Sequence, residues 1–178
     1  KGEVIALDFW EGMLRRARRR GRWLRRPRCL CADLDGLPLA DGCVDLIFAN
    51  AALQWSADPP AALAGIARVL RPGGLLIFSS FGPDTLQELR AAWAAVDGDS
   101  HVSPFLDLHD VGDALLGAGG RDTVMDAERL ILTYADTDAL MRDLKTLGAQ
   151  NATEGRRRGC TGKARLQAMR DAYEQFRA

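Results

Sequence analysis

Apolar and polar positions along the chain follow two alternating periods, which predict strands that alternate with helices. Val4–Leu7 is a continuous apolar run, typical of a strand buried on both faces, and Val44–Ala49 and Leu75–Ser80 are predicted to be further buried strands. A weaker strand is predicted at Arg28–Ala32, and another at Arg129–Tyr134. We therefore expect a sheet built from short strands that are distant in sequence.

Between these runs, apolar residues recur every three or four positions, as in amphipathic helices. Asp58 followed by Pro59 marks a helix start, because Asp is a good N-cap and Pro suits the first helical position. The stretch Arg71–Gly74 is expected to end that helix. The same period predicts further helices at Glu11–Arg20, after a capping box at Thr85–Glu88, near Leu108–Leu116, at Thr137–Leu147 and at Lys163–Phe176.

This order of elements predicts an α/β fold with a mostly parallel sheet wrapped by helices, because parallel neighbours need helical crossovers. We expect one domain over residues 1–178, with the α/β core in residues 1–134. Residues 135–178 hold two amphipathic helices separated by the basic stretch Gln150–Gly162. This tail predicts a helical insertion or lid.

Composition narrows the class of protein. The chain is 47 % hydrophobic and 27 % charged with a net charge of zero, so no overall charge attracts it to nucleic acid or a membrane. No apolar run reaches the roughly 18 residues of a membrane span. The four cysteines form no CxxC pair and there are two histidines, so we expect no metal site, reduced thiols and a cytoplasmic location. The eight arginines between Arg15 and Arg26 predict a solvated helix face, or part of a docking surface for an acidic partner.

Polar side chains follow several predicted strands. Asp8, Asp33 and Asn50 each stand where a strand ends. Ligands of open α/β sheets bind at the carboxyl ends of the strands, and an acid there can accept both hydroxyls of a ribose. Asp8 alone fits equally well as a cap of the following helix, so both interpretations stay open.

The stretches CADLDGLPLADGCVDLIFAN and LRPGGLLIFSS, together with Asp8, resemble the class I methyltransferases that use S-adenosylmethionine. The resemblance implies a Rossmann-like sheet and this cofactor. It places the ribose at Asp8 beside Phe9, the adenine amino group at Asp33, the adenine ring at the amide of Leu34, and Asn50 at the same site. The glycine-rich loop of this family is expected before Asp8, where the chain begins, so we expect the first strand and, by the same comparison, the last strand to be missing.

Four stretches narrow the resemblance: NAALQW, PFLDLHDVGDALLGAG, LMRDLKTLGAQN and GRRRGCTGKARL are similar to the malonyl-[acyl-carrier protein] O-methyltransferases of biotin synthesis. The resemblance implies methyl transfer to the free carboxylate of a malonyl thioester on acyl-carrier protein or coenzyme A, by a monomer with no nucleic-acid or membrane partner. Because that carboxylate is already ionised, we assign no catalytic base. The predicted substrate-binding residues are Gln54, Trp55, Arg142, Arg156, Arg157 and Arg158, the arginines because their guanidinium forks suit a carboxylate.

Four alternatives stay open. A mitochondrial complex I assembly factor that hydroxylates a protein arginine resembles the Phe105–Gly119 and Leu140–Asn151 stretches. A small-acid O-methyltransferase would need no carrier, and a non-catalytic scaffold would need no glycine loop. Asp8 is also compatible with a nucleotide-dependent oxidoreductase, but the sequences around Asp33 and Asn50 are not typical of that class.

Overall fold

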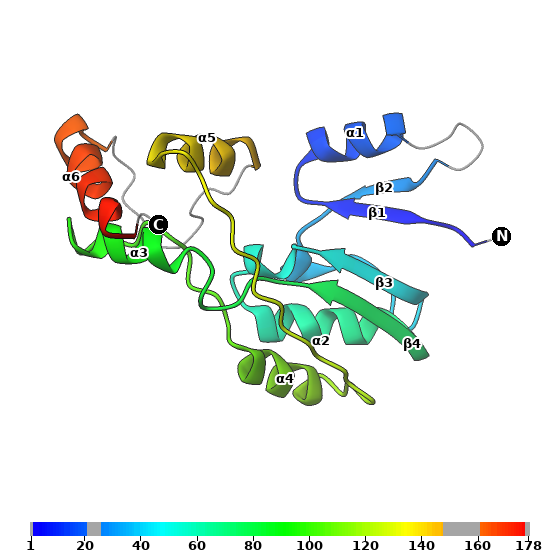
Figure 1. The fold of residues 1–178 in the computed structure, drawn as a ribbon. Helices are drawn as coiled ribbons and strands as arrows, with labels where there is room; N and C mark the ends of the chain where they lie inside the picture. Colours follow the sequence, from blue (N-terminus) through cyan, green and yellow to red (C-terminus); the bar gives the residue numbers. More distant parts are fainter. Residues whose placement is uncertain (1, 21–25, 148–160, 177–178) are drawn as a thin grey trace. The chain divides into compact units, whose positions relative to one another are not determined.

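The computed structural model describes residues 2–20, 26–147 and 161–176. They fold into two compact units, of which one comprises residues 1–80 and 109–124 and the other residues 81–108 and 125–178. The elements, in chain order, are β1 (Ile5–Asp8), α1 (Glu11–Arg20), β2 (Arg28–Cys31), β3 (Val44–Asn50), α2 (Pro59–Val69), β4 (Leu70–Ser79), α3 (Gln87–Ala94), α4 (Leu108–Gly117), α5 (Thr137–Leu147) and α6 (Lys163–Tyr173), with short 3₁₀ turns at Leu34–Gly36, Leu53–Trp55 and Glu174–Phe176 (Figure 1).

All strands of the first unit pair in parallel. β1 pairs with β2, and Asp8 lies opposite Cys31 at the end of that ladder. β3 pairs with β4, and Asn50 lies opposite Ser79, with an irregularity in register between Val44 and Leu46. The parallel arrangement predicted from the sequence is confirmed. The four strands nevertheless form two two-stranded sheets rather than one continuous sheet, because no ladder of hydrogen bonds joins the two pairs among the described residues.

Helix α2 supplies much of the core of the first unit. Its start is the predicted one: Asp58 accepts a hydrogen bond from the amide of Ala61 at 3.1 Å, and Pro59 occupies the first turn. One face of the helix is fully covered, and its buried residues are Ala62, Leu63, Ile66 and Val69.

The helix ends at Val69, just before the stretch Arg71–Gly74 that was expected to end it. The start of the strand was wrongly predicted at Leu75, because β4 begins at Leu70 and includes Arg71–Gly74. Gly73 has φ of +78°, and a Cβ on Gly74 would lie 2.9 Å from the carbonyl oxygen of Arg71. Glycine therefore lets the backbone turn from helix into strand without a separate loop.

The prediction of buried strands is also wrong, since Val4 and Ile5, in the run predicted to be buried on both faces, are 65 % and 40 % exposed. Apolar side chains of β3 and β4 are exposed, Phe48 by 71 % and Leu46 by 54 %. Leu75 and Ile77 of β4 are likewise exposed. The described residues cover only the other face of this sheet, so a continuous apolar run does not report two-sided burial here.

The second unit has its own core. Leu89, Ala92 and Trp93 of α3 pack against Met169 of α6 and against Val102, and residues of α5 pack around them. The predicted capping box at Thr85–Glu88 is wrong. Leu86 precedes the helix in a left-handed conformation (φ +56°), and no side chain caps the first turn.

The segment Arg129–Tyr134 is not a strand, contrary to the prediction. Leu130, Ile131 and Leu132 are 71–80 % exposed. No neighbouring strand pairs with this segment in the described part of the chain, so its apolar run has no ladder to join. The predicted single domain divided at residue 134 stays a prediction, and the two compact units have interleaved bounds. None of the described helices has the length and apolar character needed to cross a membrane.

Candidate functional site

The carboxyl ends of β1 and β2 bring two carboxylates to one edge of their sheet. Asp8 Oδ1 accepts a hydrogen bond from the amide of Trp10 at 2.8 Å. Asp33 Oδ1 accepts one from the amide of Asp35 at 3.1 Å. In each case Oδ2 has no hydrogen-bond partner among the described residues, and it is available to a ligand. Asp8 shapes the turn before α1, whose first amides bond to the carbonyl of Trp10 instead, so Asp8 is not itself the helix N-cap.

The backbone beside Asp33 also presents a donor. Asp33 is the N-cap of the 3₁₀ turn Leu34–Gly36, so the amide of Leu34 is at the first position of that turn. First-turn amides have no partner within their own helix, and they suit an acceptor on a ligand. Phe9 is 61 % exposed and meets Trp10 edge-on, with ring centroids 5.6 Å apart.

A second polar cluster lies at the end of β3. Asn50 Oδ1 accepts the hydroxyl of Ser79 at 2.8 Å, and the amide of Ala51 donates to the Ser79 hydroxyl and carbonyl oxygens at 3.1 Å each. Ala51 has φ of +47°, a conformation that alanine rarely adopts and that these hydrogen bonds hold. Gln54 Nε2 donates to the Ala51 carbonyl at 2.6 Å, while Gln54 Oε1 is buried without a partner. A strained backbone beside an unpaired buried oxygen is typical of a site that meets a ligand.

Asp35 joins these two regions, and the sequence analysis did not single it out. Its carboxylate accepts the hydroxyl of Ser56 and, at 2.8 Å, the amide of Ala57. It thereby ties the loop after β2 to the loop after β3. No described hydrogen bond joins Asp8 or Asp33 directly to Asn50, so this carboxylate is the polar link between the strand ends. Nothing in the sequence indicated this role of Asp35, because its partner Ser56 lies 21 positions further along the chain.

The predicted substrate-binding residues are spread over both units. Trp55 follows the β3 end and is 51 % exposed. Arg142 lies on α5 in the second unit, and its side chain is 72 % exposed and 4.0 Å from Asp136. The remaining candidates, Arg156, Arg157 and Arg158, lie outside the described residues. Their assignment stays a prediction.

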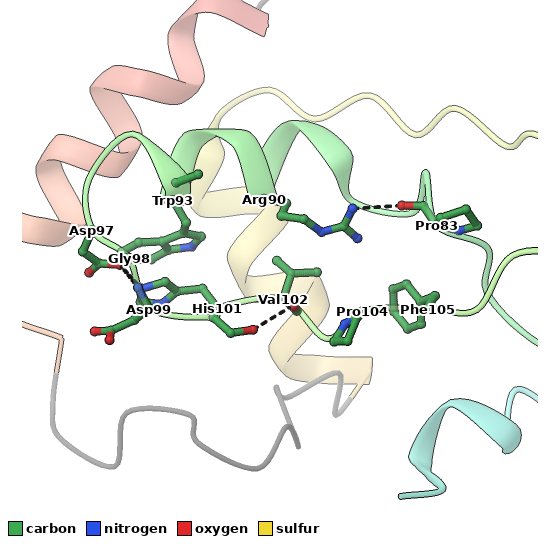
Figure 2. Close-up of a pocket in the computed structure, with 12 residues that line it drawn as sticks. Pro83, Arg90, Trp93, Asp97, Gly98, Asp99, His101, Val102, Pro104 and Phe105 are labelled. Atoms are coloured by element: carbon green, nitrogen blue, oxygen red, sulfur yellow. Dashed lines mark hydrogen bonds and ion pairs between the residues drawn. The ribbon is translucent and has the colours of Figure 1, made fainter. Parts of the chain in front are cut away.

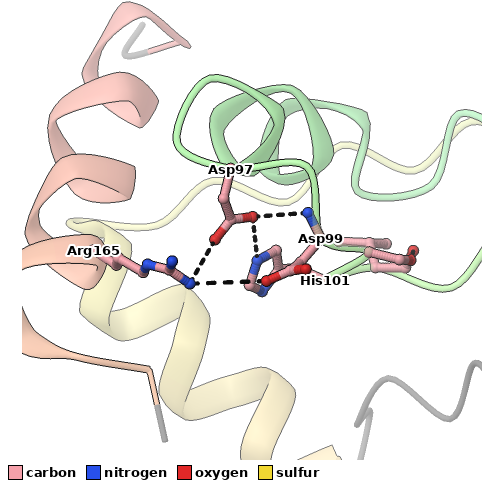
Figure 3. A network of polar contacts seen from close by, with 6 residues as sticks. Asp97, Asp99, His101 and Arg165 are labelled. Carbon is pink, nitrogen blue, oxygen red and sulfur yellow. Dashed lines mark hydrogen bonds and ion pairs between the residues drawn. The ribbon is translucent and has the colours of Figure 1, made fainter. Parts of the chain in front are cut away.

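The second unit contains a polar network that the sequence analysis missed (Figure 3). Asp97 Oδ1 lies 2.8 Å from Nε2 of His101, and Asp97 Oδ2 lies 3.4 Å from the guanidinium of Arg165. Burial raises the pKa of Asp97, but hydrogen bonds from His101, from the amide of Asp99 and from Arg165 outweigh it, so this pKa lies below its ordinary value of 3.8.

Asp97, Asp99 and His101 offer ligand atoms within 4.8 Å of one another, a spacing that can hold a metal ion. Arg165 already supplies positive charge there, since its guanidinium lies 3.4 Å from Asp97 and 3.8 Å from Asp99. A cation would compete with this arginine. One guanidinium thus already offsets part of the negative charge of these two carboxylates.

Comparison with known proteins gives a consistent result. The methyltransferase domain family matches residues 1–78. The malonyl-[acyl-carrier protein] O-methyltransferase of Halorhodospira halophila is 52 % identical over 97 % of this chain and 59 % of its own length. The protein of the same name from Laribacter hongkongensis is 48 % identical over 99 % of this chain and 62 % of its own length. The chain thus spans about three fifths of the curated relatives that it matches.

Solved structures agree on the fold. An S-adenosylmethionine-dependent methyltransferase from Mesorhizobium loti has a TM-score of 0.52 at 23 % identity, covering 66 % of this chain and 62 % of that one. A methyltransferase from Bacillus halodurans, described as putative, has a TM-score of 0.54 at 21 % identity, covering 66 % and 53 %. The chain therefore has the fold of the class I, S-adenosylmethionine-dependent methyltransferases, and over nearly its whole length its sequence is similar to the malonyl-[acyl-carrier protein] O-methyltransferases.

Proposed function

We propose that the complete protein transfers a methyl group from S-adenosylmethionine to the free carboxylate of a malonyl thioester on acyl-carrier protein, an early step of biotin synthesis. The observation that carries the proposal is the extent of similarity, because it continues from the methyltransferase match over residues 1–78 through the helices of the second unit. Those helices lie beyond the residues that the methyltransferase domain family matches.

The strand ends fit the adenosine half of this cofactor. Oδ2 of Asp8 can accept a ribose hydroxyl, while Oδ1 keeps its bond to Trp10. Oδ2 of Asp33 can accept from the adenine amino group, and the amide of Leu34 can donate to the ring. These are the acceptors and donor that an adenosine needs, and none of them requires the present hydrogen bonds to break.

Bound S-adenosylmethionine would supply an electrophilic methyl group attached to a positively charged sulfur. A carboxylate is ionised at neutral pH, so it attacks without a general base. The contribution of the protein is then to align the carboxylate oxygen with the methyl group and to exclude water. Charge is lost as the methyl leaves sulfur, so a site poor in water favours the transition state over the bound substrates.

In the proposed substrate site, the side-chain amide of Gln54 and the candidate arginines have different roles. The unpaired Oε1 of Gln54 accepts hydrogen bonds, so it repels a carboxylate and suits a donor group instead. Cationic groups must hold the malonyl carboxylate, and Arg142, Arg156, Arg157 and Arg158 remain the candidates. We place Trp55 beside the transferred methyl because its indole is exposed next to the β3 end.

The proposal includes a monomer that acts in the cytoplasm on acyl-carrier protein or coenzyme A thioesters, with no nucleic-acid or membrane partner. The relatives are bacterial, and the cysteines described, Cys29, Cys31 and Cys43, are free thiols, which suits a reducing compartment.

The test follows labelled methyl transfer by the protein expressed from its complete reading frame. Malonyl-carrier protein should accept label, and acetyl-carrier protein, which lacks a free carboxylate, should not. Transfer to neither, with the cofactor still bound, would refute the substrate assignment.

The ribose assignment is tested by Asp8→Ala, which should weaken S-adenosylmethionine binding by about 1.5–3 kcal/mol, the range for hydrogen bonds to a charged group. Asp8→Asn is the matched control. It keeps an acceptor for the amide of Trp10 and should separate the loss of the turn from the loss of the carboxylate. Unchanged cofactor affinity in both variants, measured by titration calorimetry, would remove Asp8 from the site.

A further inference from the structure

A pocket of about 600 Å³ lies in the second unit, between α3 and the loop that follows it (Figure 2). Its size is that of sites that enclose small organic ligands. Trp93, Val102, Pro104 and Phe105 give it apolar walls, and Arg90 and His101 bring polar groups to it. Neither the methyl transfer nor the adenosine contacts use this pocket.

His101 presents a hydrogen-bond acceptor. Its ring stacks on Trp93 with centroids 3.8 Å apart and planes 11° apart, and its Nε2 lies 2.8 Å from Asp97 Oδ1. An ionised carboxylate only accepts hydrogen bonds, so the Asp97 contact places the proton on Nε2. In the neutral ring Nδ1 then carries the lone pair, and it has no hydrogen-bond partner in the described parts of the chain. The stack and the carboxylate together fix both the position and the direction of this acceptor.

Arg90 presents donors to the same pocket. Its guanidinium donates to the carbonyl oxygens of Pro83 at 2.9 Å and Thr85 at 3.1 Å. No described carboxylate pairs with it, although the side chain is half-buried. A guanidinium carries five N–H groups, so donors remain after these two bonds. A half-buried cation held only by carbonyl oxygens favours a further acceptor from a ligand.

The acidic end of the pocket already has a cationic partner. The guanidinium of Arg165 faces both Asp97 and Asp99 and offsets part of their charge (Figure 3). The pocket therefore offers a ligand an acceptor on His101, donors on Arg90 and apolar walls. A chain of methylene groups interrupted by amides has this character, because each amide offers one carbonyl oxygen and one N–H.

We propose that this pocket binds the pantetheine-type arm on which the malonyl group is carried, with Arg90 donating to an amide carbonyl and Nδ1 of His101 accepting from an amide N–H. The apolar walls then cover the methylene and methyl groups of the arm. The inference rests on the proposed function, since it takes the malonyl thioester as substrate. Acyl-carrier protein and coenzyme A both present their acyl groups on this arm, so the pocket would serve either source.

Direct binding tests the pocket without methyl transfer. Pantetheine itself is titrated into the protein expressed from its complete reading frame. His101→Phe keeps an aromatic ring on Trp93 and removes the acceptor, and it should weaken binding about three- to tenfold, the usual value of one hydrogen bond. Arg90→Met should do the same, and Arg90→Lys should restore part of the affinity. The matched controls are His109→Phe and Arg121→Met, two exposed residues outside the pocket, which should bind as wild type.

Kinetics then test whether the arm matters for the reaction. Wild type should show a lower KM for malonyl-pantetheine than for the ethyl thioester of malonate, which lacks both amides. In His101→Phe and Arg90→Met this advantage should shrink three- to tenfold, while kcat and the KM for the ethyl thioester stay constant. Comparing the KM values of malonyl-carrier protein and malonyl-coenzyme A in wild type and in these variants shows for which of the two substrates the contacts to the arm matter more.

The possible results separate the two proposals. If wild type does not bind pantetheine, or if the His101 and Arg90 variants bind it as tightly as wild type with unchanged melting temperatures, the pocket assignment is overturned. An equal rise in KM for both thioesters would also overturn it, because a general loss of structure would act on both. If pantetheine binds but no malonyl thioester is methylated, the pocket assignment stands and the proposed function fails.

Discussion

The link between the two strand-end loops gives the sharpest test of how the cofactor site is held. Asp35 accepts hydrogen bonds from the Ser56 hydroxyl and the Ala57 amide, which places the loop after β2 against the loop after β3. We predict that Asp35→Ala lowers both the free energy of unfolding and the affinity for S-adenosylmethionine. The affinity falls because Asp33 and Leu34 are on the loop that Asp35 holds.

The magnitude follows from the two hydrogen bonds. Bonds to a charged group contribute about 1.5–3 kcal/mol each when buried, but Asp35 is exposed and water competes for its oxygens. About 1 kcal/mol for each bond, and so about 2 kcal/mol for Asp35→Ala, is the appropriate scale. Ser56→Ala loses the bond to Asp35 and also the bond that the Ser56 hydroxyl accepts from the Asp58 amide at 3.1 Å.

A double-mutant cycle isolates the contact. Asp35→Ala, Ser56→Ala and the double variant are unfolded with urea, and each is titrated with S-adenosylmethionine. The two losses should fail to add by about 1 kcal/mol, and cofactor affinity should fall about fivefold in Asp35→Ala. Losses that add within about 0.3 kcal/mol would show that the two side chains do not interact, and unchanged cofactor affinity would refute the link between this contact and the site.

Two further predictions concern the second unit. Met169 is fully buried, so Met169→Ala should lower the free energy of unfolding by about 2–5 kcal/mol in urea denaturation, whereas the exposed control Leu116→Ala should change it by less than about 0.5 kcal/mol. Because the folded protein holds the pKa of Asp97 below 3.8, the unfolded chain binds a proton there more readily; stabilisation by this carboxylate is therefore present above pH 3.8 and lost as the pH falls through the lower folded value. The stability difference between wild type and Asp97→Asn should be constant well above pH 3.8 and shrink as the pH falls below it, and a difference that does not change with pH across this range would contradict the network.

Several helices could be predicted closely because their signals are local. Glu11–Arg20 and Thr137–Leu147 begin and end as predicted, since an amphipathic period needs no knowledge of the partner that covers it. The N-cap at Asp58 is equally local. The capping-box pattern at Thr85–Glu88 failed because backbone geometry overrode it: Leu86 takes a left-handed conformation that starts the helix later.

The candidate site divides in the same way. Asp8, Asp33 and Asn50 were predictable because the end of a strand is visible in the sequence as a change from apolar to polar residues. Which carboxylate oxygen of Asp8 and Asp33 can meet a ligand was not predictable. Only the structure shows that one oxygen of each accepts a hydrogen bond from the amide of Trp10 or Asp35.

The sequence by itself determined the alternation of strands and helices as far as α4 and the polar residues at strand ends, because these depend on neighbours along the chain. The helical crossovers between strands favoured the parallel pairing that the structure has. Tertiary structure alone decided the contacts made across many positions. Asp35 meets Ser56 over 21 residues, and Asp97 meets Arg165 over 68. It also left Arg129–Tyr134 without a strand neighbour among the described residues, and it gathered Arg90, Trp93 and His101 around one pocket. The physical reason is that a hydrogen bond or a stacked ring requires two groups at a defined distance, and the pattern of one segment does not contain the position of the other.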